Sequence, residues 1–375
     1  MRHKISWFCG MLAIFGLGSA IIAAPARAAD LDYGKLGTPV HLVVGYQPYD
    51  SEAWSAVVLN GLQLWKKYLP PGSTVEFQQA LQGSIIVNNM LAGKQSIGYF
   101  GDMPAIVGAT KTNVAPLRIV AAISLSHDLC NILFVSNNAP QFPNGKAAAA
   151  WLSGKTVAAP KGSCSDRFAR AVFEKMGVQP QAYLNQNIEL ITSGFRANKL
   201  DAAIVWEPIA SQLVEEGLAR RVATGNDFDE PDGNFIDMRA DLIQQRPDVA
   251  KAWLEAELAA EQYIGDPKNT AEIVKLAEQQ TTGISAHALW QSLFGTYNAA
   301  QGGSSLREYL PFGFSDSTLE LIRKDTAFLY STKVIAVPQL PAGAIDPLLT
   351  DEILQEHGLK APAVELNAQP ESAFK

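Results

Sequence analysis

Short hydrophobic runs alternate along much of the chain with segments whose apolar positions repeat every three or four residues. The runs predict strands and the periodic segments predict helices. Strands are expected at 40–49, 73–81, 96–100, 117–124, 130–137, 156–159 and 202–205. Helical spacing follows several of them, at 54–65, 83–91, 164–176 and after 208. From about residue 245 the pattern is mainly helical, with helices at 246–264 and 270–280 and a last one near 348–357 among extended, proline-containing links.

Small or polar residues stand where these strands give way to helices. Alternating strands and helices predict an α/β protein with open, mostly parallel sheets, whose ligands bind beyond the carboxyl ends of the strands. One junction, "APKGSCSDRF" at 159–168, places Ser163, Cys164 and Ser165 at a helix start. Such residues cap helices, and free N–H groups at a helix start also attract anions. The junction by itself favours capping.

The first 28 residues are predicted to be a secretory signal peptide. Arg2 and Lys4 precede an almost wholly apolar stretch, and Ala26-Arg27-Ala28 offers a cleavage site with small residues. The apolar run is short for a membrane span, and no later stretch is long and apolar enough to cross a bilayer. We therefore expect an exported protein with cleavage near Ala28.

The charge of the mature chain argues against a nucleic-acid partner. Without its signal peptide the chain has 27 basic residues against 37 acidic ones, since only Arg2, Lys4 and Arg27 are lost. A nucleic-acid binder is usually basic, so a site for an anion must be local. The remaining length of about 347 residues favours two lobes over one core.

Four segments in order resemble a known family: "VVGYQPY", "GYFGDMPAIV", "GKTVAAPKGS" and "KLDAAIVWEPIA". They are similar to the periplasmic substrate-binding proteins of ABC importers for sulfonates, taurine and nitrate, over roughly residues 38–270. The resemblance implies an α/β, two-lobed type II periplasmic binding protein fold with a ligand cleft between the lobes. Lobe 1 would be 38–125 plus 230–375, with the C-terminal helices, and lobe 2 would be 126–229. It further implies a monomer that serves a permease and an ATPase of the inner membrane.

The resemblance also implies which residues face the cleft. They are Gln47, Tyr49, Gly83, Ser84, Gly101, Asp102, Ser163, Cys164, Ser165, Trp206, Glu207 and Asp237. Hydroxyl, amide and backbone N–H donors suit a weakly basic, delocalised anion such as a sulfonate or nitrate. Asp102 and Glu207 would repel an anion unless they receive an ammonium group of the ligand, as in taurine. Asp102 is as well explained as a turn or helix cap.

Cys130 and Cys164 depart from the family's pattern and leave three interpretations open. An oxidising compartment favours a disulfide. Free buried thiols are the second interpretation, and a soft-metal site formed with His127 is the third.

Neither a catalytic site nor a cofactor or resident metal is expected. The chain has no G-x-S-x-G, H-E-x-x-H or P-loop motif. The resemblance implies extracytoplasmic capture of a small organic anion resembling a sulfonate or taurine, and its delivery to the permease. Nitrate or bicarbonate binding is an alternative, as is a binder of pyrimidine or thiamine precursors or an enzyme acting on them with the same fold.

Overall fold

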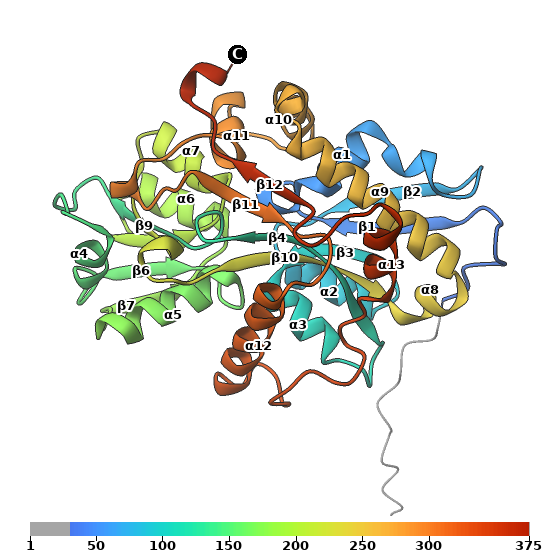
Figure 1. Ribbon diagram of the computed structural model, residues 1–375. Coiled ribbons are helices and arrows are strands. Elements are labelled where there is room, and N and C mark those ends of the chain that lie inside the picture. Colours follow the sequence, from blue (N-terminus) through green and yellow to red (C-terminus); the bar gives the residue numbers. More distant parts are fainter. Residues whose placement is uncertain (1–30, 375) are drawn as a thin grey trace, which may run out of the picture.

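The computed structural model describes residues 31–374, in which two β-sheets form the centres of two lobes (Figure 1). The predicted signal peptide lies outside the described residues. Within the described part, no helix has the length and apolarity needed to cross a membrane.

The larger sheet has seven strands in the order β12-β11-β4-β10-β3-β1-β2. They are β1 (His41–Tyr46), β2 (Thr74–Gln79), β3 (Ile97–Gly101), β4 (Leu117–Ser126), β10 (Asp232–Arg239), β11 (Leu306–Leu310) and β12 (Val364–Asn367). Strand β1 is parallel to β2 and β3, whereas β10 is antiparallel to β3 and β4. This sheet and the helices packed on it are called the larger lobe.

The smaller sheet has five strands in the order β7-β6-β8-β5-β9. They are β5 (Ile132–Ser136), β6 (Thr156–Ala159), β7 (Ala182–Asn185), β8 (Ala202–Val205) and β9 (Ala219–Thr224). Strand β6 is parallel to β7 and β8, and β5 is antiparallel to β8 and β9. This sheet and its helices are called the smaller lobe.

Helices cover both sheets. They are α1 (Trp54–Leu62), α2 (Gly83–Leu91), α3 (Asp102–Ala109), α4 (Gly145–Ala150), α5 (Cys164–Met176), α6 (Ile188–Arg196), α7 (Ile209–Glu215), α8 (Ala240–Gln245), α9 (Pro247–Gly265), α10 (Thr270–Gln280), α11 (Ala286–Leu293), α12 (Asp316–Ser331) and α13 (Leu348–Glu356). The segments with strong apolar periodicity form the predicted elements, because that spacing places one continuous face against a sheet. Helix α9, for example, buries Val249, Trp253 and Leu254.

The chain passes between the two sheets through two short segments. Residues 127–131 connect β4 to β5, and residues 225–231 connect β9 to β10. Strands β4 and β10 pair with each other in the larger sheet, so both segments leave from neighbouring strands. The structure thus confirms the predicted α/β fold with two lobes. The sheets are mixed and not mostly parallel as predicted, because β4, β5, β9 and β10 beside the crossing segments pair antiparallel, and so do β11 and β12. The predicted boundary between residues 125 and 126 falls at the end of β4. The predicted boundary between residues 229 and 230 falls within the segment 225–231 that connects β9 to β10.

The C-terminal third differs from the expectation of helices and extended links. Strands β11 and β12 extend the larger sheet beyond β4, with Tyr309 opposite Leu125, and α12 is a further helix. Both strands are only four or five residues long and carry charged residues, Arg307 and Glu308 in β11 and Glu365 in β12. Short polar strands have no hydrophobic run to mark them, so they were not predicted.

Candidate functional site

A small cavity lies between the two lobes and is called the ligand cavity. The centre of a water molecule can occupy about 40 Å³ of it, which is room for about three waters. The larger lobe contributes Gln47, Asp50, Gln82, Gly83, Ser84, Gly101 and Pro104 to its wall. The smaller lobe contributes Pro160, Lys161, Gly162, Ser163, Cys164 and Trp206.

Two helices begin at the ligand cavity, one from each lobe. Helix α2 starts at Gly83, and its N-cap residue Gln82 makes no side-chain cap. Helix α5 starts at Cys164, and the Ser163 hydroxyl caps it by accepting from the Asp166 N–H at 3.4 Å. The first N–H groups of a helix have no partner within the helix, and the helix dipole places positive charge there. Both lobes therefore present groups that favour an anion.

Gly83 allows α2 to start this close to the neighbouring chain. A Cβ atom at this position would lie 2.5 Å from Cγ of Pro104 and 2.8 Å from Cβ of Phe100. Any larger residue would push the start of α2 away from β3 and α3.

Gln47 and Asp50 bring buried oxygen acceptors to the ligand cavity. Both residues follow β1 and are 4% and 6% exposed. Asp50 Oδ2 accepts from Asn234 Nδ2 at 2.9 Å, while Asp50 Oδ1 and Gln47 Oε1 have no hydrogen-bond partner. Burial raises the pKa of Asp50 to about 7. The sequence analysis missed Asp50, although an acid directly after the first strand's "GYQPY" was a usable indication.

Seven of the twelve predicted cleft residues line the ligand cavity. They are Gln47, Gly83, Ser84, Gly101, Ser163, Cys164 and Trp206. The other five do not line it. They are Tyr49, Asp102, Ser165, Glu207 and Asp237.

Glu207 lies in a buried ionic network behind the cavity instead of in its wall. Its Oε1 accepts from Arg221 Nη1 at 3.1 Å and from the Tyr297 hydroxyl at 3.3 Å. Its Oε2 accepts from the Ser211 N–H at 2.8 Å. A carboxylate already engaged by these donors is not free to receive a ligand's ammonium group.

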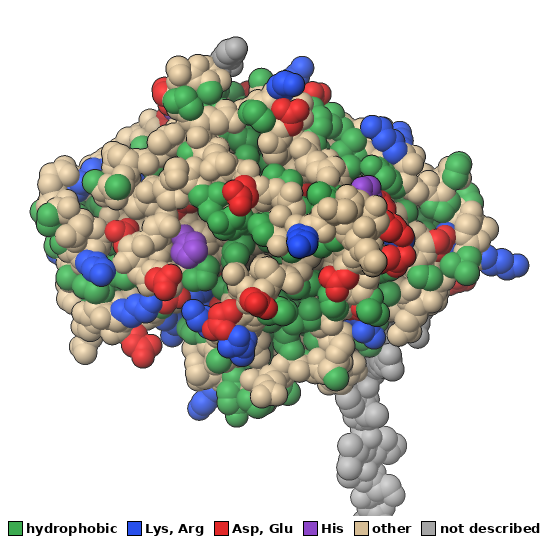
Figure 2. Space-filling view, in the orientation of Figure 1, with side chains coloured by type: hydrophobic (Ala, Val, Ile, Leu, Met, Phe, Trp, Pro, Cys, Tyr) green, Lys and Arg blue, Asp and Glu red, His purple; other side chains and the backbone are tan. Residues whose placement is uncertain are grey.

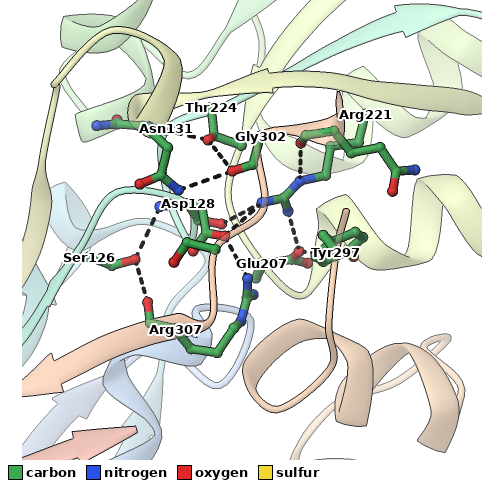
Figure 3. A network of polar contacts seen from close by, with 12 residues as sticks. Ser126, Asp128, Asn131, Glu207, Arg221, Thr224, Tyr297, Gly302 and Arg307 are labelled. Carbon is green, nitrogen blue, oxygen red and sulfur yellow. Dashed lines mark hydrogen bonds and ion pairs between the residues drawn. The ribbon is translucent and has the colours of Figure 1, made fainter. Parts of the chain in front are cut away.

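The same network joins the two lobes beside the first crossing segment (Figure 3). Asp128 Oδ2 accepts from Arg221 of β9 at 3.2 Å and from Arg307 of β11 at 2.7 Å. The two guanidinium groups thus come from different lobes and share one carboxylate of the segment between them. The partners are far apart in sequence, so the sequence analysis could not find them.

Asp102 and Asp237 are also buried away from the cavity wall. Asp102 Oδ1 accepts from the Met103 N–H at 2.6 Å. Burial raises the pKa of Asp102, and the positive charge of Arg167 in α5 opposes that increase. Asp237 lies in β10 with both carboxyl oxygens unpartnered, and burial raises its pKa well above the usual range. Asp237 therefore faces the interior of the larger lobe and does not meet a ligand.

Tyr49 and Ser165 contact neighbouring protein groups. The Tyr49 hydroxyl accepts from the Thr282 N–H at 2.9 Å, and its carbonyl accepts from the Trp206 indole at 2.8 Å. Ser165 donates to the Cys130 carbonyl at 3.1 Å. Tyr49 thus orients the Trp206 ring that forms part of the cavity wall.

Cys130 and Cys164 form a disulfide. The bond attaches the first crossing segment to the first residue of α5, at the wall of the ligand cavity. Of the three interpretations left open by the sequence, the disulfide is the one found. It uses both sulfur atoms that a soft-metal site would have required, and residues 31–374 contain no group of three His, Cys, Asp or Glu side chains arranged to hold a metal ion.

Charged side chains on the face drawn in Figure 2 are mixed in sign. Acidic and basic groups are scattered over this face, without a continuous basic patch. A nucleic-acid interface would need such a patch.

The fold and the cavity define a class of protein. Two α/β lobes joined by two crossing segments, with a cavity between them, are the type II periplasmic binding protein fold. The chain belongs to the NMT1-like family, whose model matches residues 37–278.

Solved structures with the same fold include binding proteins and an enzyme. The alkanesulfonate-binding protein SsuA of Xanthomonas axonopodis, bound to MOPS, has a TM-score of 0.65 at 18% identity, covering 82% of this chain and 99% of that one. The nitrate-binding protein NrtA of Synechocystis has a TM-score of 0.63 at 19% identity, covering 84% of this chain and 88% of that one. The desulfurization enzyme DSZB has a TM-score of 0.59 at 15% identity, covering 84% of this chain and 99% of that one. At these identities the likeness concerns the fold alone.

Among curated relatives, a binding protein of Brucella abortus is 22% identical over 218 residues. The match covers 56% of this chain and 63% of that relative, so it spans less than two thirds of the relative's length.

Proposed function

We propose that this protein is the extracytoplasmic solute-binding component of an ABC importer and captures a small organic anion of the sulfonate class between its lobes. The observation that carries the proposal is the convergence of the α2 and α5 N-termini on one cavity from opposite lobes. Backbone N–H groups fixed at helix starts hold a delocalised anion without a strong cation.

The proposed mechanism is closure of the two lobes on the ligand. Contacts from both helix starts exist together only when the lobes are closed, so the ligand shifts the population toward the closed form. The closed form would then be recognised by the permease. The predicted signal peptide and the family's binding-protein members support placing this step in the periplasm.

The small size of the ligand cavity favours few-atom ligands. Room for about three waters suits a one- or two-carbon sulfonate, nitrate or bicarbonate better than a bulky sulfonate. Nitrate and bicarbonate therefore remain the second candidates within the same binding function.

A thermal-shift screen of residues 29–375 tests the proposal. The compounds are methanesulfonate, ethanesulfonate, taurine, nitrate, bicarbonate, acetate and a thiamine pyrimidine precursor. A ligand present at 100 times its Kd adds about 2.7 kcal/mol to the free energy of unfolding, which raises the melting temperature by a few degrees. A saturable rise with a small sulfonate supports the proposal, a rise only with nitrate or bicarbonate supports the second candidates, and no rise with any small anion contradicts it.

A further inference from the structure

Two hydrogen bonds join the lobes directly beside the ligand cavity. The indole N–H of Trp206, the residue that follows β8 in the smaller lobe, donates to the Tyr49 carbonyl of the larger lobe at 2.8 Å. The Ser51 N–H of the larger lobe donates to the Glu207 carbonyl of the smaller lobe at 3.0 Å. Both bonds connect the segment after β1 with the segment after β8, and together they are called the interlobe contact.

The segment after β1 is held in place by its own lobe. The Trp54 indole N–H donates to the Pro48 carbonyl at 3.1 Å, and the Thr282 N–H donates to the Tyr49 hydroxyl at 2.9 Å. Thr282 follows α10, which packs on α1. The Tyr49 carbonyl is therefore already oriented when the smaller lobe reaches it, which reduces the entropy lost on forming the interlobe contact.

Trp206 is held in place by the smaller lobe and by the first crossing segment. The Glu207 N–H donates to the Leu129 carbonyl at 2.8 Å, and the Ala210 N–H donates to the Trp206 carbonyl at 3.1 Å. Trp206 is 4% exposed and lines the ligand cavity. It thus belongs both to the wall that faces the ligand and to the contact that joins the lobes.

Other contacts between the lobes lie away from the cavity. Ser285 Oγ donates to Glu215 Oε2 at 2.7 Å at the surface, and Arg167 Nε of α5 lies 2.9 Å from Asp325 Oδ1 of α12 as a buried ion pair. None of these four residues lines the ligand cavity. A ligand in the cavity can therefore reach the interlobe contact through Trp206, but not these pairs.

The interlobe contact links closure to affinity. Its donors and acceptors belong to different lobes, so it forms only when the lobes are closed. One hydrogen bond typically shifts an equilibrium by about two- to twelvefold. The apparent affinity equals the affinity of the closed form multiplied by the fraction of the protein that is closed. A contact that favours closure before the ligand arrives therefore raises the affinity, whichever anion is bound.

We infer that Trp206 is a positioning residue for closure: its indole N–H, bonded to the Tyr49 carbonyl, holds the lobes together and so raises the affinity for the ligand. This inference rests on the proposed function, because closure serves binding only if a ligand is captured. It adds a role that a residue of the cavity wall does not need, since a wall residue acts only when the ligand is present.

Distances between spin labels in the ligand-free protein test the inference without a ligand. Labels on Asn88→Cys in α2 and Glu189→Cys in α6 occupy exposed positions in different lobes and distinguish open from closed molecules. Trp206→Phe keeps an aromatic ring but has no N–H to donate. Ser51→Pro removes the other donor, and a helix accepts proline at its first position when the residue before it is extended, as Asp50 is. We expect closed molecules in the unsubstituted protein, and a closed-to-open ratio about two- to twelvefold lower in each variant.

Two control variants separate the interlobe contact from a general loss of stability. Trp253→Phe removes an indole hydrogen bond inside the larger lobe, where Trp253 donates to the Tyr99 hydroxyl at 2.8 Å. Ser51→Ala keeps the N–H that Ser51→Pro removes. Both controls should leave the distance distribution unchanged. If either Trp206→Phe or Ser51→Pro fails to fold, the other variant decides.

Titration of ethanesulfonate into the same proteins connects closure with binding. Ser51→Pro should raise the Kd by the factor by which the closed fraction falls, although Ser51 does not line the cavity and loses no contact with the ligand. Absence of closed molecules in the wild type, unchanged distances in both variants, or a Kd that does not follow the closed fraction overturns the inference and leaves the proposed function standing. Shifted distances without binding of ethanesulfonate, nitrate or bicarbonate to the wild type contradict the proposed function, while the role of Trp206 in closure stands.

Discussion

Cys130 is bonded to Cys164, and this bond fixes the start of α5 to the first segment that crosses between the lobes. The helix start proposed to hold the anion is therefore tied to a segment that joins the two lobes. The bond closes a loop with a sequence separation of 34 residues.

Removing the disulfide should lower stability strongly. For a loop of this length the chain-entropy estimate is about 3 to 4 kcal/mol of the free energy of unfolding. The measurement is a denaturant titration of the wild-type protein and of the Cys130→Ser/Cys164→Ser variant, each with and without reductant. Reductant should shift the midpoint of the wild-type protein only, and an unshifted wild-type midpoint would mean that the bond does not form.

Ser163 should stabilise the start of α5 and thereby position the backbone N–H groups proposed to hold the ligand, because its one hydroxyl proton is already donated to the Pro160 carbonyl. Its hydroxyl donates to the Pro160 carbonyl at 2.6 Å and accepts from the Asp166 N–H, so Ser163→Ala should cost about 1 kcal/mol of stability. Combined with Ser84→Ala, it should also weaken binding of a small sulfonate more than tenfold. Asn187→Ala, which removes the equivalent cap of α6, should cost similar stability and leave affinity unchanged. If the Ser163→Ala and Asn187→Ala variants bind the sulfonate with equal affinity, Ser163 does not contribute to ligand binding.

Arg221 should be essential to stability. Its guanidinium is fully buried and pairs with Glu207 and Asp128, so Arg221→Ala leaves Glu207 without its guanidinium partner. Breaking a buried pair by removing one partner typically costs about 3 to 5 kcal/mol. The control is Arg196→Ala, whose pair with Glu216 is solvent-exposed and is worth about 1 kcal/mol or less. Chemical denaturation measures both variants, and similar losses would show that the buried network contributes little.

Asp237 should make stability depend on pH. Burial raises its folded pKa well above the ordinary value, so the folded state keeps a proton that the unfolded state releases above about pH 4. This group's contribution to the free energy of unfolding thus falls by about 1.4 kcal/mol for each pH unit between its unfolded and folded pKa values. Asp237→Asn cannot ionise and should remove this dependence.

The unfolding free energies of the wild-type protein and Asp237→Asn, measured between pH 5 and 8, check this prediction. The variant should gain stability relative to the wild type as pH rises. Parallel pH profiles would mean that Asp237 is ionised or solvated in the folded protein.

Local sequence patterns predicted most of the strands and helix starts that form the wall of the ligand cavity. The starts of α2 and α5 were marked by Gly83-Ser84 and by Ser163 before apolar periodic runs, because caps and periodicity are local properties. Strand β10 was not predicted, since its polar side chains Asn234 and Asp237 are buried and its composition does not resemble a core strand.

The acids at the site were predicted less well, because their roles depend on distant partners. The family resemblance of "KLDAAIVWEPIA" placed Glu207 at the cleft, but Arg221 and Tyr297 hold it in the interior. Asp50 was missed because its place in the cavity wall and its hydrogen bond from Asn234 appear only when α2, α5 and β10 are assembled around it.

Ligand binding between the starts of α2 and α5 is tested most directly by an equilibrium titration of ethanesulfonate into three proteins: the wild type, Ser84→Trp and Asn88→Trp. Ser84 lines the ligand cavity, whereas Asn88 is exposed further along the same helix and does not line it. We expect saturable 1:1 binding to the wild type and to Asn88→Trp, and loss of binding for Ser84→Trp with an unchanged melting temperature. Binding to Ser84→Trp with wild-type affinity would contradict it, because the ligand would then lie outside the cavity between the two helix starts.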